Sequence, residues 1–206
     1  MTPMDGSGPA SGESVRADGF RTSAAAAAGR SGDLDRDGET SILLDAVAVM
    51  ANWRRRSPFR CRAFRRTPER TETYRLEVRP VEASFSCVDE RTGTVDAYDA
   101  PTGRYVSGGE ERPLDRWQLL PEPLAARLAF PLNLPVWGRP SDGYRMTGAS
   151  IDGALTVIRL RHQADDGVRG TMTVDPRLRL VTRFDTSTET CWYEDVEAWV
   201  EHSPIR

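Results

Sequence analysis

The sequence predicts an α+β fold: a curved antiparallel half-barrel of about ten strands, with an N-terminal helix and a short helical lid. Three observations predict it. Most of the chain after residue 58 alternates apolar and polar residues with a period of two, which is typical of half-buried strands. Turn residues separate these segments at short intervals, as in antiparallel meanders. Helical spacing of apolar residues occurs before the strands and again around residues 113–129.

Residues 1–40 are predicted to form a disordered tail. They are rich in Gly, Ser, Ala and Asp, and Phe20 is their only aromatic residue. Such a segment buries too little apolar surface to offset an ordering entropy of about 1–2 kcal/mol per residue. Residues 33–38 match the first half of an EF-hand calcium loop, but Leu44 stands where the loop needs a bidentate Glu, so we expect no metal site.

Residues 41–56 are predicted to form one amphipathic helix. Its apolar residues recur at helical spacing: Ile42, Leu43, Ala46, Val47, Met50 and Trp53. Ser41 is a suitable N-cap, and the basic residues 54–56 suit the last turn, where positive charge favours the helix dipole. Pro58 ends the helix, whose apolar face must rest on another element.

Five strands are predicted after this helix and five more in the C-terminal half. They cover residues 59–63, 74–79, 83–87, 95–98, 104–107, 144–149, 154–162, 168–174, 180–186 and 189–196. In the last of them, alternation places Trp192 and Val196 on one face and Tyr193 and Glu197 on the other. We expect a single domain over residues 41–200, followed by a frayed C-terminus at 201–206.

Residues 110–140 interrupt the strands. Leucines and Trp117 at helical spacing predict one or two short helices after Pro113. The segment 130–137 then contains more large apolar side chains than a solvated loop needs, so it must cover apolar surface.

Composition and charge argue against a nucleic-acid partner or a membrane span. The chain has 206 residues, a net charge of -3 and no apolar run long enough to cross a bilayer. All of its 28 basic side chains are Arg, which is typical of a GC-rich coding sequence. Residues 54–79 hold ten Arg against three Glu, and residues 82–115 hold eight acids against three Arg. Ion pairs between neighbouring strands explain both runs better than phosphate binding does.

The cysteines predict a reducing compartment. Cys61, Cys87 and Cys191 are odd in number and lack C-x-x-C spacing, and His162 and His202 complete no zinc cluster with them. We therefore expect free, buried thiols and a cytoplasmic location for the chain as written. Export is expected only if the true start lies elsewhere, because residues 24–28 are too short for a signal-peptide core.

No catalytic motif is present. Neither histidine lies in a nucleophile motif such as G-x-S-x-G, and Asp165-Asp166-Gly167 is typical of a hairpin turn. We therefore expect a non-enzymatic protein that uses no cofactor.

The order of elements resembles the LolA/LppX-like superfamily of lipoprotein carriers over residues 41–200. The matching features are the helix 41–56, the meander segments 95–99 and 103–106, the insertion 113–129, and the hairpins with residues 170–176 and 180–184. The resemblance implies an incomplete antiparallel barrel closed by helices, with a hydrophobic cavity for acyl chains. The chain departs from the family's exported members because it shows no export signal and no lipid-acceptor Cys, and no binding residue matches by motif.

The favoured hypothesis is therefore the binding of an apolar ligand, such as a lipid or acyl chain, between the sheet and a movable helical lid. The candidate strand residues are Phe59, Tyr74, Leu76, Phe85, Val157 and Met172, and the candidate lid residues are Trp117, Leu120, Leu128 and Trp137. In the alternative, these residues simply pack as core. The protein is then an interaction or regulatory module that binds another protein through an edge or the lid.

Overall fold

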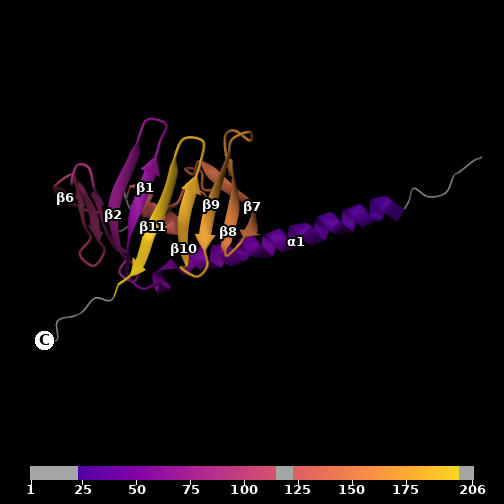
Figure 1. Cartoon of the computed structure of the whole chain (residues 1–206), viewed down its shortest axis with the longest axis horizontal. Helices are drawn as coiled ribbons and strands as arrows, with labels where there is room; N and C mark the ends of the chain where they lie inside the picture. The colour runs from indigo at the N-terminus through magenta and orange to yellow at the C-terminus, as the bar shows by residue number, and fades with distance from the viewer. Residues whose placement is uncertain (1–22, 115–122, 200–206) are drawn as a thin grey trace, which may run out of the picture. The chain divides into compact units, whose positions relative to one another are not determined.

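The computed structural model describes residues 23–114 and 123–199, which contain an open, curved sheet of eleven antiparallel strands (Figure 1). The strands are β1 (Phe59–Arg66), β2 (Thr71–Arg79), β3 (Ser84–Asp89), β4 (Val95–Asp99), β5 (Arg104–Ser107), β6 (Glu110–Pro113), β7 (Tyr144–Asp152), β8 (Leu155–His162), β9 (Arg169–Asp175), β10 (Leu180–Asp185) and β11 (Thr190–Ala198). The predicted sheet-dominated architecture with few helices is confirmed, and β6 is the strand that the sequence pattern did not indicate.

Two meanders make up the sheet, and they meet at its centre. The strand order is β6-β5-β4-β3-β2-β1-β11-β10-β9-β8-β7, and β11 lies between β1 and β10 in Figure 1. In the central pair Ala63 lies opposite Tyr193, and Phe64 lies opposite Trp192. The first and last strands along the chain are therefore neighbours, and β6 and β7 form the two edges.

The N-terminal helix α1 (Ser23–Ala51) begins earlier and ends sooner than the predicted helix 41–56. A 3-10 turn, η1 (Trp53–Arg55), follows it. Residues 23–40, which the sequence pattern assigned to the tail, are helical, because an alanine-rich start favours helix and no proline interrupts the segment. The chain up to Arg36 and the chain from Asp37 onward form separate units. The rest of the predicted tail and the segment 201–206 lie outside the described residues.

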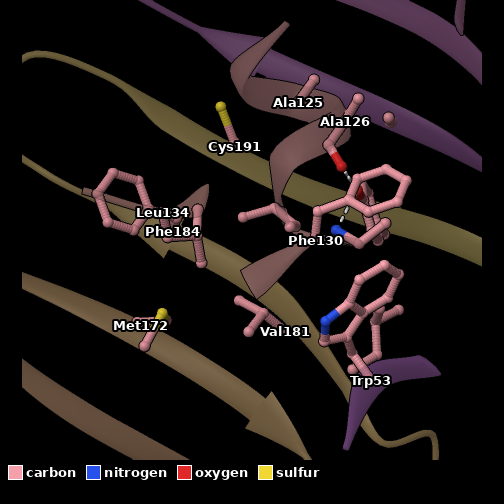
Figure 2. Packing of buried hydrophobic residues seen from close by; sticks show 14 of the residues in the cluster. Trp53, Ala125, Ala126, Phe130, Leu134, Met172, Val181, Phe184 and Cys191 are labelled. Atoms are coloured by element: carbon pink, nitrogen blue, oxygen red, sulfur yellow. Dashed lines mark hydrogen bonds between the residues drawn. The ribbon is translucent and has the colours of Figure 1, made fainter. Parts of the chain in front are cut away.

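One face of the sheet, here called the inner face, is covered by helices and by the apolar segment 130–137. From Asp37 onward α1 buries Ala46 and Met50 against the core, and α2 (Leu124–Arg127) packs on β1 and β11. The 3-10 turn η2 (Pro131–Asn133) follows α2. Figure 2 shows Phe130 beside Trp53, whose ring meets it edge-on with the centroids 5.1 Å apart. The expectation that segment 130–137 covers apolar surface is confirmed, since Phe130, Leu134 and Val136 are buried.

Two predicted strand faces were wrong. Val157 is only half-buried on β8, because the inner face of that strand carries Ile158 and Leu160. In β11, Trp192 stacks on Phe64 on the outer face, whereas Val196 packs against the core. The cause is a register shift opposite β1 near Asp195, whose φ of 53° marks a local break in the alternation.

Candidate functional site

Six of the ten candidate residues for the apolar site are packed into the core. Phe59, Tyr74, Leu76, Phe85, Leu128 and Met172 are all buried in one core cluster. Trp137 is partly buried against that cluster, Val157 is on the other face, and Trp117 and Leu120 lie outside the described residues. In the described part of the chain, the gap between α1, η2 and the sheet is too small to hold a water molecule.

The apolar segment is also fastened in place. The buried carboxylate of Asp142 accepts hydrogen bonds from the backbone N–H of Trp137 at 2.8 Å and of Arg139 at 3.1 Å. The Arg139 guanidinium pairs with the same carboxylate at 2.9 Å and donates to the Leu134 carbonyl at 2.8 Å. Gly138 therefore lies between two residues whose backbones are anchored to one carboxylate.

Tyr193 fixes α2 to the sheet. Its buried hydroxyl donates to the Ala126 carbonyl at 3.2 Å and accepts from the Ala129 N–H at 3.1 Å. Burial raises the pKa of Tyr193 well above its ordinary value, so the hydroxyl stays protonated and can serve both partners. The segment from α2 to Ala129 is thus held by polar contacts as well as by apolar packing.

The three cysteines are free and buried, as predicted. Burial disfavours the thiolate and raises the pKa values of Cys61, Cys87 and Cys191 from 9.0 to about 12. These are inert structural thiols, because reactivity requires an accessible thiolate.

We expect the native protein to react with a thiol reagent at pH 8 only as fast as it unfolds. Because the folded pKa values lie above the unfolded ones, the stabilisation that the thiols give is complete below pH 9 and is lost as the pH rises toward 12. Dithionitrobenzoate labelling with and without urea, and urea titrations across this pH range, measure both effects. Rapid labelling of the native protein would contradict the assignment.

The outer face, in contrast, contains a groove of about 300 Å³ over the first meander. Its floor follows one row of paired residues across five strands, from Glu77 through Ser86, Ala97 and Val106 to Glu111. The three central side chains are small, and the glutamates at the two ends are long. The hollow therefore forms because the strand register aligns short side chains in the middle of the row and long ones at its ends.

Arginines and an aromatic ring line the rest of the groove. The backbone N–H of Trp199 donates a hydrogen bond to the Pro58 carbonyl, just before β1, at 3.0 Å. The Arg79 guanidinium lies 5.6 Å from the centre of the Trp199 ring. Arg104 forms an ion pair with Glu111, which raises the pKa of Arg104 and lowers that of Glu111. The groove thus presents both signs of charge beside an indole.

A second hollow, of about 350 Å³, lies next to the groove over β11, β1 and β2. Glu77 lines both hollows. In the second one, Arg60 pairs with Glu197 at 2.9 Å. Glu77 itself has no ion-pair partner among the described residues. This carboxylate is therefore available where the two hollows meet.

The predicted ion pairing between strands is present, but mostly with other partners. Arg62 and Glu90, at 3.5 Å, connect the two oppositely charged runs. Arg65 pairs instead with Glu189 at 2.8 Å, because β11 lies beside β1. No local pattern indicated this neighbour, since the two strands are far apart along the chain.

Among the described residues, no group of three or more His, Cys, Asp or Glu side chains is placed to hold a metal ion. Within the same ranges, no helix has the length and apolar character needed to cross a bilayer. His162 has a structural role, since its Nδ1 accepts hydrogen bonds from the backbone N–H groups of Ala164 and Asp165.

Comparison with known proteins gives no family for this chain. No protein-family model matches it, and no curated protein matches it. One similar solved structure is an uncharacterized conserved protein from Thermus thermophilus, at 13% identity and a TM-score of 0.38. The match covers 78% of this chain and 86% of the other. The resemblance to LolA/LppX-like carriers stays a prediction.

Proposed function

We propose that this chain is a non-enzymatic interaction module with a solidly packed sheet, and that it binds a protein segment in the groove on its outer face. The observation that carries the proposal is the contrast between the two faces. Among the residues that the structure describes, the gap beside α1 on the inner face has no room for a water molecule, whereas the outer face holds two adjoining hollows of about 300 and 350 Å³. Of the two sequence-based hypotheses, this contrast favours the interaction module over the carrier of an apolar ligand.

The lining of the groove indicates the chemistry of the partner. Arg104 already neutralises Glu111, and Arg60 neutralises Glu197, so these pairs offer a polar wall with little net charge. Glu77, between the hollows, has no ion-pair partner in the described ranges 23–114 and 123–199. A polypeptide segment suits this surface if its main chain bonds to the polar walls and a Lys or Arg side chain reaches Glu77.

Selection from a random peptide library against the full chain tests this proposal. We expect enriched peptides to carry a basic residue. Ala97→Trp, which fills the floor of the groove, should abolish their binding, and Glu77→Gln should weaken it roughly tenfold, as expected for the loss of one charged hydrogen bond. Ser150→Trp, which places the same indole on an exposed position of β7, is the matched control.

An apolar-ligand assay separates this proposal from the alternative. With the inner face filled, we expect an environment-sensitive apolar dye to stay dark with the folded protein and fatty acid to cause no change. Dye fluorescence that fatty acid displaces, together with peptide binding that Ala97→Trp leaves intact, would overturn the proposal in favour of a lipid carrier.

A further inference from the structure

Two hairpin turns lie at the same end of the sheet, at the lower ends of the strands in Figure 1, and each carries an exposed apolar residue. The turn 80–83 joins β2 to β3, and the turn 176–179 joins β9 to β10. Val81 is 69% exposed on the first turn, and Leu178 is 36% exposed on the second. The two turns approach each other near η1, because Pro80 and Arg179 line the same narrow gap as Trp53.

Basic residues surround these apolar tips. We call the whole set the hairpin rim: Arg54, Arg55, Val81, Arg177, Leu178 and Arg179. All four of its arginines are exposed. Two acids lie nearby: Glu82 faces Arg79 at 4.0 Å, and the Asp175 carboxylate accepts from two backbone N–H groups of its own turn. The rim itself contains four arginines and no acid, in a chain whose net charge is -3.

The tips are presented by well-defined turns. Each turn begins with a proline and ends with a non-glycine residue in the left-handed region, Ala83 at φ 55° and Arg179 at φ 49°. This conformation is unfavourable for such residues and persists only where the surrounding structure holds it. The exposed Val81 and Leu178 therefore protrude from fixed turns and do not fold back on the core.

We propose that the hairpin rim docks on an anionic phospholipid surface. Arginines near such a surface are attracted by its negative potential, and a protruding valine and leucine gain by entering the boundary between headgroups and acyl chains. A nucleic acid would satisfy the arginines but would give the two apolar tips nothing to bury against. None of the rim residues lines either outer hollow, so this site does not depend on the proposed peptide groove.

Co-sedimentation of the full chain with vesicles tests the inference, with phosphatidylserine–phosphatidylcholine vesicles compared with phosphatidylcholine alone. We expect binding only to the anionic vesicles, with affinity falling as salt rises. Arg177→Glu should weaken it about 30-fold, through loss of attraction and added repulsion. Leu178→Ser should weaken it about tenfold, because less apolar area is buried.

Arg91→Glu is the matched control. Arg91 and Arg177 occupy equivalent places in turns capped by the preceding aspartates, with backbone N–H to carboxylate distances of 2.8 Å in each, but Arg91 lies at the opposite end of the strands. The length of the strands between them exceeds a Debye length of about 10 Å, so Arg91→Glu should leave binding nearly unchanged. The inference is overturned if anionic vesicles do not bind, or if Arg91→Glu weakens binding as much as Arg177→Glu. It is also overturned if Leu178→Ser has no effect on vesicles while duplex DNA binds.

Discussion

Replacing Phe130 with alanine is expected to lower the free energy of unfolding by about 3–5 kcal/mol, because a fully buried ring is removed from a core that cannot close around the gap. Phe130 contacts Trp53 edge-on, and its ring centre lies 5.7 Å from that of Phe85, so it connects η1, the lid segment and the sheet. The variant should also gain an apolar cavity where the native protein has none. A small apolar ligand such as benzene should then bind and raise its stability.

Urea unfolding of both proteins, with and without benzene, measures this effect. Phe130→Leu retains more of the side-chain volume and should be destabilised less. It replaces the alanine variant in the same measurement if that variant does not fold. Leu132→Ala is the control within the same segment. Its side chain is 45% exposed, so the expected change is below about 0.5 kcal/mol. Benzene that stabilises the native protein as strongly as the variant would show that the inner face already holds a cavity.

Asp142→Ala is expected to destabilise the protein by about 2–4 kcal/mol, since it removes the acceptor for two backbone N–H groups and the partner of Arg139. The carboxylate is almost wholly buried, but the guanidinium is one-third exposed, which limits the cost of leaving it unpaired. Asp142→Asn keeps one acceptor oxygen, so its free energy of unfolding should lie between those of the native protein and Asp142→Ala. Segment 130–137 should loosen first.

Hydrogen exchange across segment 130–137 and urea unfolding measure these changes. Asp166→Ala is the control, because Asp166 also pairs with arginine, at 3.3 Å from Arg145, but is exposed at the surface. Surface pairs contribute about 0–1 kcal/mol, so little change is expected. Equal effects of the two substitutions would mean that Asp142 does not hold segment 130–137 in place.

Local alternation was sufficient to predict most of the strands and the burial of the cysteines. It could not predict the pairing of β1 with β11, because that contact joins distant parts of the chain and leaves no local signal. It also failed where alternation is ambiguous. The segment 155–160 has apolar residues on both faces, so its pattern does not indicate which face Val157 occupies. The register shift near Asp195 places Trp192 and Val196 on opposite faces, although alternation predicts one face for both.

The candidate site was harder to predict than the fold. The burial of Leu76 and Met172 followed from their pattern, but whether buried side chains leave a cavity depends on volumes that no sequence pattern contains. The groove was missed because its floor depends on register between strands. Small outward residues such as Ser86 and Ala97 on consecutive strands were a usable signal, but only after the strands are aligned.

The central position of β1 has a consequence for synthesis. β1 emerges from the ribosome early, whereas β11, which occupies its second side, is the last described strand to emerge. Until then the nascent first meander exposes a long unpaired edge, which is prone to join other chains. The arginines on one face of β1, Arg60, Arg62 and Arg66, act as gatekeepers on that edge, because like charges repel a second copy aligned beside it.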